Sequence, residues 1–590
     1  MGNKKEKWVV LARRADFRQI ASQFGIDQVT ARIIRNRGVT GDAAIREYLQ
    51  GGMESLHDPG LLRGCTDAAS LLLELIRFGK KLRIIGDYDI DGVNASYILY
   101  RGITRCGGCV DYEIPDRMKD GYGLNIHLIE LALSEGIDTV ITCDNGISAL
   151  DEISYAKKQG LTVIVTDHHE PLFEDTPGGR RFLLPCADIV VNPKQPDCPY
   201  PYKKLCGAAV AWKVICELYR LADVPEEEAE ELLTFAAFAT VGDVMDLDGE
   251  NRILVKEGLK RLHCCENYGL RALIRANGLD QQTVSSYHIG FVLGPCINAS
   301  GRLDTARRSM KLLLSESMEE ASALAQELTG LNEERKRMTQ EAVEQSCSMI
   351  ESGEYADDRV LVVYLPDCHE SIAGIVAGRL RERYYRPVFV VTDGESSAKG
   401  SGRSTEAYSM FEEMVRCSDL FLKFGGHPMA AGFSLEKERI PEMRRRLNEN
   451  CTLSESDQQE KVSIDVPMPI DYITEKLVGE LSLLEPFGKG NEKPLFAEAH
   501  LKLLSAKVLG KHGNVLKLRV MNGTGCVMDG MYFGDTEEMQ RYLTEKYGAA
   551  RVQELFWGRA EGMELDVTYY PSVNEYMGRR TLQIVIKNYR

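Results

Sequence analysis

Three short apolar runs, each ending in acidic or histidine residues, constrain the fold of this chain more than any other feature. The runs are LRIIGDYD (82–89), TVITCDNG (139–146) and LTVIVTDHH (161–169), and amphipathic stretches separate them. Apolar runs of this length between helices are typical of a parallel sheet with helices on both faces. We therefore expect an α/β domain in which the polar ends of the runs meet at the carboxyl edge of one sheet, where ligands bind.

The pattern changes twice further along the chain. Residues 311–350 contain no Pro and one Gly and show helical spacing of Leu and Ala, which predicts a long helix connecting two lobes. The runs RVLVVYLPD (359–367) and PVFVVTDG (387–394) predict a second, smaller α/β unit. A polar, turn-rich linker near residue 455 precedes short alternating strands. These strands predict an antiparallel barrel of the OB-fold type, a platform for single strands.

Bulk composition excludes several classes of protein. The chain has 590 residues, 44% of them hydrophobic and 27% charged, so we expect a soluble protein with several domains. No apolar run reaches the roughly 20 residues needed to span a bilayer. The start MGNKKEKWVV has no apolar signal region behind it, so we expect a cytoplasmic location. Sixteen scattered cysteines are expected to be reduced thiols, and the pair Cys106 and Cys109 lacks a second pair that would complete a zinc site.

The net charge of -16 is unusual for a protein that binds a polyanion. The basic residues are concentrated, however: residues 1–40 hold nine Lys or Arg against three Asp or Glu, a net of +6. A second basic cluster lies at residues 379–386. Each cluster alone fits a solvated helix face equally well. An acidic metal site also inflates the negative count, because bound divalent ions would neutralise it.

The motif GDYDIDG places Asp87, Asp89 and Asp91 at alternating positions where a strand ends, and Gly92 allows a tight turn. Three carboxylates this close repel one another unless cations neutralise them, which indicates a metal site. The alternatives are a solvated acidic turn or a calcium loop. The EF-hand pattern fails here, because no Glu follows at the required distance and a strand precedes the motif.

The ends of the other runs add ligands of the same kind. TCDNGIS supplies Asp144, TDHHE supplies Asp167, His168 and His169, and FATVGDVMDL supplies Asp243. Carboxylate and imidazole without thiolate suit Mn²⁺ or Mg²⁺, and imidazole favours Mn²⁺. Two such ions about 3.5 to 4 Å apart can activate a water and stabilise the leaving oxygen of a phosphate ester. The implied reaction is phosphoester hydrolysis.

The order of these motifs resembles the DHH phosphoesterase superfamily. GDYDIDG, CDNG and DHH follow one another as in that family, and GPCINASGRL (294–303), CHESIAGIVAGRL (368–380) and FGGHPMAAGF (424–433) resemble its DHH-associated domain. RGVTGDAAIREYL (37–49) and LEPFGKGNEKPLF (484–496) are similar to the RecJ family of bacterial single-stranded-DNA-specific exonucleases. The resemblance covers nearly the whole chain.

The patterns and the resemblance together predict an α/β fold in five segments. They are an N-terminal helical and basic segment (1–60), a parallel-sheet DHH catalytic domain (61–310), a long connecting helix (311–350), a smaller α/β DHH-associated domain (351–452) and a C-terminal antiparallel β-barrel of the OB-fold type (453–590).

The resemblance implies a 5′ to 3′ exonuclease that releases mononucleotides from single-stranded DNA in recombination and repair, using two Mn²⁺ or Mg²⁺ ions. The implied metal ligands are Asp87, Asp89, Asp91, Asp144, His168 and Asp243. His169 matches the histidine that aids catalysis, either by protonating the leaving oxygen or by polarising phosphate, and we assign Asp167 to the catalytic group with it.

The resemblance also implies contacts with the strand. Arg117 and Arg302 fall where the family binds the 5′ phosphate, and a planar guanidinium pairs well with phosphate oxygens. The further implied phosphate contacts are Asn298, Arg403, Ser404 and His427. The family generally has Arg where Cys296 stands and Trp-His-x-Gly where Cys368, His369, Glu370 and Ser371 stand. Loss of a cation and a stacking aromatic should weaken DNA contact, so we expect an active nuclease with altered affinity or end preference.

Two other functions compete with this hypothesis. One is a DHH-family phosphodiesterase for oligonucleotides or cyclic dinucleotides, but such enzymes typically lack the long helix and the barrel. The other is a DNA-binding scaffold without catalysis, in which the acidic cluster would be broken, whereas here every acidic position is filled. The expected partners are single-stranded DNA with a 5′ end, a helicase and a single-strand-binding protein. We expect a monomer and no membrane association.

Overall fold

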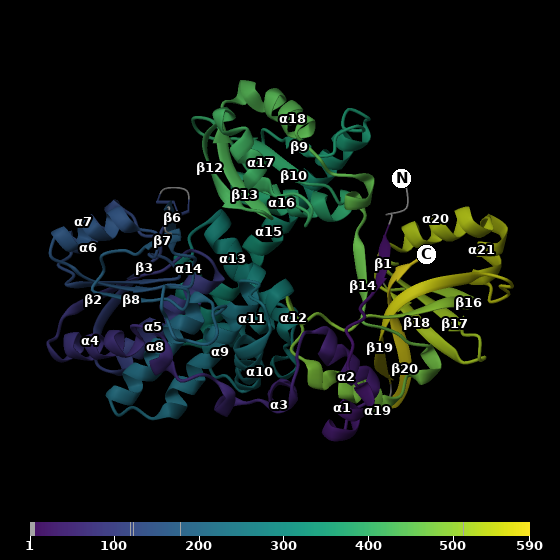
Figure 1. Cartoon of the computed structure of the whole chain (residues 1–590), viewed down its shortest axis with the longest axis horizontal. Helices are drawn as coiled ribbons and strands as arrows, with labels where there is room; N and C mark the ends of the chain where they lie inside the picture. Colours follow the sequence, from purple (N-terminus) through teal and green to yellow (C-terminus); the bar gives the residue numbers. More distant parts are fainter. Residues whose placement is uncertain (1–5, 118–119, 122, 177–178, 511–512, 577) are drawn as a thin grey trace. The chain divides into compact units, whose positions relative to one another are not determined.

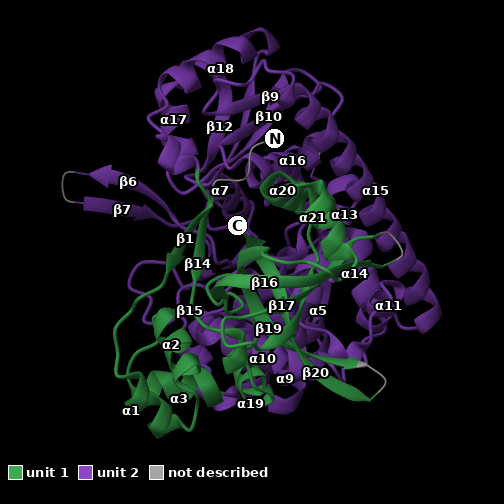
Figure 2. Ribbon diagram, turned by 90° about the vertical axis from the view of Figure 1, so that its right-hand side faces the viewer, with its two compact units in different colours: residues 1–51, 459–590 green, residues 52–458 purple. Residues whose placement is uncertain are grey.

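The protein, described by a computed structural model, consists of two compact units (Figure 2). One unit joins residues 1–51 to 459–590, and the other comprises residues 52–458. The five segment boundaries predicted from the sequence stay predictions. The structure describes residues 6–117, 120–121, 123–176, 179–510, 513–576 and 578–590.

The larger unit contains a five-stranded parallel sheet in the order β3-β2-β4-β5-β8 (Figure 1). The strands are β2 (Lys81–Ile85), β3 (Cys109–Glu113), β4 (Thr139–Cys143), β5 (Thr162–Thr166) and β8 (Ile189–Val191). Right-handed crossover connections are the rule for such parallel strands. All parallel strands end at the same edge, so the polar ends of the three apolar runs come together there.

Helices cover both faces of this sheet, which explains why its central strands are apolar throughout. Ile84, Ile141 and Ile164 belong to one buried cluster, whereas Val140 and Val163 belong to another. The first cluster includes α4 (Cys65–Arg77), α5 (Ile90–Arg105) and α8 (Gly207–Leu221), and the second includes α6 (Ile126–Ser134) and α7 (Leu150–Lys158). Burial on both faces holds the strand ends in fixed positions.

The predicted long helix is observed, but it begins later than residue 311. Helix α14 (Arg307–Leu314) ends at Ser315, and α15 (Met318–Glu351) begins after Ser317. The Ser317 side chain accepts a hydrogen bond from the backbone N–H of Glu320, a helix N-cap, so the chain stops one helix and starts another.

Helix α15 leads to a second sheet with the order β12-β13-β11-β10-β9. Only β9 and β10 are parallel to each other, and the remaining pairs are antiparallel. The elements are β9 (Leu361–Tyr364), α16 (Glu370–Tyr384), β10 (Val388–Asp393), β11 (Ala398–Arg403), β12 (Phe421–His427), β13 (Ala430–Leu435) and α18 (Ile440–Glu449). This is the smaller α/β module that the sequence predicts.

The other unit is built on a closed barrel. Its sheet has the order β15-β16-β17-β18-β20-β19, and pairing of β16 with β19 closes it. The strands are antiparallel neighbours except for the pairs β15–β16 and β18–β20. They are β15 (Val466–Pro467), β16 (Phe496–Leu509), β17 (Val515–Met521), β18 (Val527–Tyr532), β19 (Glu564–Tyr576) and β20 (Arg579–Tyr589).

The N-terminal segment packs in the same unit as this barrel. Strand β1 (Lys7–Val10) pairs in parallel with β14 (Lys461–Ile464). Arg37 makes two hydrogen bonds to the Asp465 carboxylate, at 2.8 and 3.2 Å, and the Tyr48 hydroxyl donates to Asn491. Part of the basic charge near the N-terminus therefore stabilises the fold. Among the described residues, no helix is both long and apolar enough to cross a membrane.

Candidate metal centre

The predicted acidic residues meet at the carboxyl edge of the parallel sheet. Asp87 follows β2, Asp144 follows β4, and His168 follows β5 by two residues. These three side chains are at most 6% exposed. Asp243 reaches the same place from α9 (Glu226–Gly242), where it is the C-cap residue. The edge thus collects ligands from segments more than 150 residues apart.

The first turn of α5 is held by the GDYDIDG motif itself. The Asp89 carboxylate accepts hydrogen bonds from the N–H groups of Asp91 and Gly92, at 2.8 and 3.1 Å, and so caps the helix. A Cβ on Gly92 would lie 2.4 Å from the carbonyl oxygen of Asp87. Only glycine therefore allows the helix to start this close to the strand end.

Asp91 is fixed by a second helix. Both of its carboxylate oxygens accept hydrogen bonds from the start of α8, from Gly207 N at 2.6 Å and Ala208 N at 2.7 Å. Gly207 also lies against Asp144, because a Cβ there would be 2.7 Å from the Asp144 Cβ. Asp144 itself adopts a φ of 61°, a left-handed conformation that Asp tolerates at a sharp turn. Backbone geometry thus orients two of the carboxylates.

His168 lies between these carboxylates. Its Nε2 is 3.1 Å from Asp144 Oδ1 and 3.6 Å from Asp91 Oδ2. Burial lowers the pKa of His168, so the neutral ring that binds metals is favoured.

The ligand atoms form three overlapping groups, within each of which they lie no more than 4.8 Å apart. The groups are Asp144, His168 and His169; Asp91, His168 and Asp243; and Asp87, Asp89 and Asp144. Since Asp144 and His168 belong to two groups each, the donors form one continuous cluster. Its size and composition suit two divalent cations with oxygen and nitrogen ligands, such as Mn²⁺ or Mg²⁺.

Two observations support the fit of cations to this cluster. Asp87 Oδ1 and His168 Nδ1 are buried polar atoms with no hydrogen-bond partner among the described residues. Burial first, and then the neighbouring carboxylates, raise the pKa of Asp87, Asp89 and Asp144 above the usual range. Buried carboxylates that repel one another are stabilised by a bound cation, so the site is electrostatically prepared for metal.

Asp167 has a different environment from the other aspartates. It accepts hydrogen bonds from the backbone N–H of Ile147, His168 and His169, and its Oδ1 is 2.8 Å from His169 Nδ1. Burial alone would raise the pKa of Asp167, but the hydrogen bond and charge of His169 outweigh it and lower that pKa. These contacts hold the His169 ring in a fixed orientation.

The pKa of His169 is shifted in the opposite direction from that of Asp167. Burial opposes protonation of its ring, but the hydrogen bond to Asp167 and the surrounding carboxylates raise its pKa to about 9. In the metal-free protein the ring is therefore protonated at neutral pH. A cation bound nearby would lower that pKa.

Four arginines gather in the same unit. Arg117 lies over the Tyr88 ring at 5.1 Å, and Arg302, on α13 (Gly294–Leu303), donates to the Ser371 carbonyl oxygen at 2.7 Å. Burial, followed by Arg117, Arg335 and Arg403, lowers the pKa of Arg302 to about 10. Within the described part of the chain, none of the four arginines pairs with a carboxylate. We call Arg117, Arg302, Arg335 and Arg403 the arginine group.

The other residues predicted to contact the DNA strand differ in their surroundings. The Asn298 Oδ1 accepts a hydrogen bond from Ile90 N at 2.8 Å, which ties α13 directly to the GDYDIDG motif. The Ser404 side chain is buried and donates to the Tyr408 carbonyl oxygen at 2.6 Å. His427 is exposed at the end of β12. Asn298 thus lies at the metal cluster, whereas the Ser404 hydroxyl stabilises its own loop.

The structure adds one residue that the sequence did not indicate. Arg335 lies on α15 and donates to Asn332 Oδ1 at 3.1 Å, among many charged residues of a helix with a regular amphipathic pattern. Nothing in that pattern distinguishes it. Cys296 is buried and accepts a hydrogen bond from Asn332 at 3.4 Å, so it packs beside the arginine group without contributing charge.

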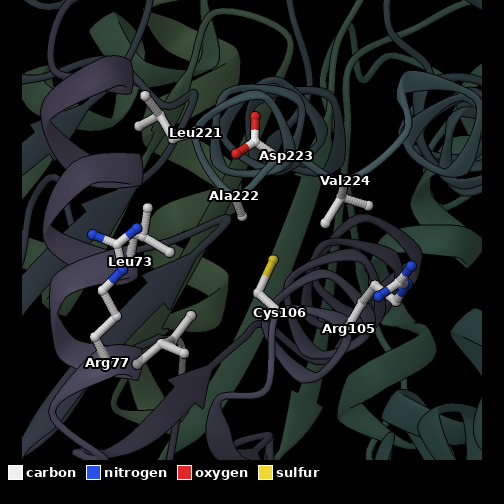
Figure 3. Close-up of a pocket in the computed structure, with 9 residues that line it drawn as sticks. Leu73, Arg77, Arg105, Cys106, Leu221, Ala222, Asp223 and Val224 are labelled. Atoms are coloured by element: carbon white, nitrogen blue, oxygen red, sulfur yellow. The ribbon is translucent and has the colours of Figure 1, made fainter.

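A separate pocket of about 320 Å³ is shown in Figure 3. It lies at the C-terminal end of α5, whereas the cluster lies at the N-terminal end. The Cys106 side chain points into the pocket, near Arg77, Arg105 and Asp223. Cys106 follows the last residue of α5, whereas the metal cluster lies at the first turn. The pocket is therefore distinct from the metal centre.

Comparison with known families agrees with this geometry. The DHH family N-terminal domain matches residues 81–240, the DHHA1 domain matches 357–452 and the RecJ OB domain matches 464–588. A parallel sheet edged by aspartates and a histidine pair, followed by a DHHA1 domain, identifies the DHH class, and the OB domain is a RecJ feature. The predicted fold class is confirmed.

Individual relatives narrow the class. The single-stranded-DNA-specific exonuclease RecJ of Bacillus subtilis is 33% identical over 589 residues, covering 99% of this chain and 71% of that protein. The Escherichia coli protein of the same name is 32% identical, covering 94% of this chain and 95% of its own length. The chain therefore belongs to the RecJ family of single-stranded-DNA-specific exonucleases, as the sequence motifs predict.

Solved structures have the same architecture. The crystal structure of RecJ in complex with Mn²⁺ from Thermus thermophilus matches with a TM-score of 0.81 and 29% identity, covering 99% of this chain and 80% of that one. The corresponding complex with Mg²⁺ matches with a TM-score of 0.75 and 27% identity, covering 99% of this chain and 78% of that one.

Proposed function

We propose that this chain degrades single-stranded DNA from its 5′ end and releases mononucleotides by metal-dependent phosphodiester hydrolysis, in DNA recombination and repair. One observation carries the proposal most strongly. A buried cluster of carboxylates and histidines at the sheet edge shares its unit with an arginine group that has no acidic partners among the described residues. Hydrolysis of a polyanion requires both kinds of site.

The ligands proposed for two Mn²⁺ or Mg²⁺ ions are Asp87, Asp89, Asp91, Asp144, His168 and Asp243. When bound, such ions activate a water and neutralise charge that develops on the phosphate. The protein supplies a rigid frame for them. Asp91 is held by two backbone N–H groups and Asp89 by two others, so these carboxylates keep their orientation before any ion arrives.

His169 is proposed as the catalytic acid or phosphate-polarising residue, and Asp167 as its positioning partner. Because the Nδ1 of His169 is engaged by Asp167, proton transfer would involve Nε2. The negative charge of Asp167 stabilises the protonated ring, as it does in other histidine–aspartate pairs.

The arginine group is proposed to bind the 5′ phosphate and the backbone next to it. A guanidinium that donates only to carbonyl or amide oxygens retains its full positive charge for a phosphate. Asn298, Arg403, Ser404 and His427 stay proposed phosphate contacts, and the buried Ser404 hydroxyl has the weakest geometric support.

The barrel favours a long single-stranded substrate and not a dinucleotide, because OB-folds bind single-stranded nucleic acids. A helicase that unwinds duplex and a single-strand-binding protein are the proposed partners, acting with a monomeric enzyme. A cytoplasmic location belongs to the same proposal, because the substrate would be chromosomal DNA.

The decisive experiment uses the purified full chain with Mn²⁺ and three substrates: a 5′-phosphorylated single strand labelled at its 3′ end, the same sequence as blunt duplex, and a dinucleotide. We expect the labelled strand to shorten in single-nucleotide steps while the duplex persists. Cleavage of the dinucleotide alone would instead favour the oligonucleotide phosphodiesterase. Equal degradation of duplex and single strand would contradict the proposal.

A further inference from the structure

Three large apolar side chains are exposed on two segments that pack together at the C-terminal end of α9, where Asp243 is the C-cap residue. Tyr287, Phe291 and Val244 have 62%, 69% and 61% of their surface exposed. The rings of Tyr287 and Phe291 have centroids 5.0 Å apart and planes inclined by 30°. We call these three residues the apolar ledge. The two rings lie together, and exposed apolar side chains that do so indicate a binding surface more often than isolated ones do.

The helix that carries the two rings is irregular at this point. Residues Ile289–Leu293 form a π-helical turn between α12 (Ser286–His288) and α13. Such turns are rare and occur frequently at functional sites. The same helix continues to Asn298 and Arg302, so the rings belong to an element that also contacts the GDYDIDG motif and joins the arginine group.

The glycines of this helix place it against residues that are close in sequence to the proposed metal ligands. A Cβ on Gly290 would be 3.8 Å from Val241, two residues before Asp243, and a Cβ on Gly294 would be 3.1 Å from the side chain of Ile90. The π-helical turn is therefore packed on the end of α9, where Asp243 is the C-cap residue.

Val244 adds an independent observation. It follows Asp243 and adopts a φ of 56°, in a helix-ending turn where its N–H donates to Val241 O and the N–H of Met245 donates to Thr240 O. Glycine normally occupies this position, and a β-branched side chain there is a conformational outlier. A bulky apolar group thus stays exposed at a strained position directly after a metal ligand, and strain of this kind concentrates at functional sites.

We propose that the apolar ledge stacks on unpaired bases of the DNA strand close to the scissile phosphate. The inference rests on the proposed nuclease function and adds to it a means of selecting single strands. A strand presents charged phosphates and flat apolar bases. The arginine group suits the phosphates, and aromatic rings suit the faces of bases of any sequence. In a duplex those faces are already covered by neighbouring base pairs, so the ledge discriminates against paired DNA.

The test combines a protein change with a substrate change. In a 5′-phosphorylated single strand, abasic residues replace the first four nucleotides one at a time. For the unmodified protein we expect one replacement to reduce kcat/KM about tenfold, the order of magnitude for losing one stacked base. In the double variant Tyr287→Ala, Phe291→Ala, the same replacement should change kcat/KM less than about twofold, because the stacking is already lost.

Two controls make the outcome specific. The swap Tyr287→Phe, Phe291→Tyr keeps both rings and should keep the full effect of the abasic replacement. Phe78→Ala removes a ring that is 72% exposed at the end of another helix and should behave as the unmodified protein does. An identical abasic profile for the double variant and the unmodified protein would overturn the proposal, as expected if the ledge instead binds a protein.

A second readout separates this inference from the nuclease proposal. Fluorescence anisotropy in EDTA measures strand binding without turnover, using intact and abasic oligonucleotides. If the protein fails to degrade DNA with Mn²⁺, the nuclease proposal fails, yet loss of the abasic effect on Kd in the double variant still supports stacking. An unchanged abasic effect on Kd contradicts stacking whatever the activity.

Discussion

The acidic cluster and the arginine group are two charged sites of the same unit, and they are built in opposite ways. The cluster is supplied by short motifs at strand ends, and backbone N–H groups hold Asp89 and Asp91 in place. The arginine group comes from four separate elements, and its side chains donate to carbonyl and amide oxygens or lie over a ring. One site has carboxylates held rigidly by the backbone, and the other has long, flexible side chains.

This difference predicts how each site responds to substitution. Removing a ligand from a rigid cluster should abolish the chemistry and leave strand binding largely intact. Removing one arginine should weaken binding by an amount that depends on the number of arginines that remain.

The largest effect is expected for Asp144→Ala, because Asp144 belongs to two of the three ligand groups. Hydrolysis with Mn²⁺ should fall at least about 1000-fold, equivalent to several kcal/mol of lost stabilisation. Oligonucleotide binding, measured by anisotropy, should change little. Asp151→Ala, in the exposed first turn of α7, is the matched control. Turnover within about tenfold of normal would rule out this cluster as the metal centre.

Asp167→Asn should reduce kcat by roughly 100-fold and leave KM unchanged, because the protonated His169 ring loses its negatively charged partner. The concentration of Mn²⁺ that gives half-maximal activity should stay the same. Combining Asp167→Asn with His169→Gln tests the assignment: if Asp167 acts only through His169, the double variant is no slower than His169→Gln alone. An additional loss would show that Asp167 has another role.

Arg302→Gln should raise KM for a 5′-phosphorylated strand about 10- to 100-fold, since a charge-assisted contact with phosphate is lost. A strand with a 5′ hydroxyl should be affected much less. Arg445→Gln provides the comparison, because Arg445 on α18 is exposed and lies 2.7 Å from Glu449. If Arg302→Gln raises KM equally for the 5′-phosphorylated and the 5′-hydroxyl strand, Arg302 contacts an internal phosphate of the DNA and not the 5′ phosphate.

The smallest effect is expected for Arg335→Gln, which leaves three arginines in place. Affinity should fall only a few-fold, and the slope of log Kd against log salt should decrease by about one, as expected for one phosphate contact. Lys336→Gln changes the neighbouring residue, which pairs with Glu333 on the exposed side of α15, and should leave the slope unchanged. Equal salt slopes for the two variants would show that Arg335 does not contact a phosphate of the bound DNA.

The difference between the acidic cluster and the arginine group also explains which residues could be predicted from the sequence. The proposed metal ligands could be recognised in the sequence because a buried parallel strand is apolar to its end. A carboxylate one or two residues after such a strand is conspicuous, as with Asp144 and Asp87. The fold class followed from the same runs. The arginine group could be predicted only in part. The family resemblance indicated Arg117, Arg302 and Arg403, whereas nothing in the sequence distinguishes Arg335 from the other charged residues of α15.

Other features depend on contacts that no local pattern records. The N-terminal segment packs with the barrel through Arg37 and Asp465, which are separated by more than 400 residues. The helix break at Ser315 depends on a capping hydrogen bond to Ser317. The apolar ledge arises because a π-helical turn packs on the end of α9, beside a strained Val244, and neither conformation is encoded by periodicity.

The hydrogen bond between Asn298 and Ile90 has a consequence for the length of the product. It fixes α13 to the motif that holds the metal ligands, and Arg302 lies one helical turn further, about 6 Å along the axis. If Arg302 binds the 5′ phosphate as proposed, a rigid turn of helix sets the separation between that phosphate and the metal cluster. A fixed distance between the bound 5′ phosphate and the metal cluster would make every released fragment the same size, whatever the base sequence or the length of the DNA strand.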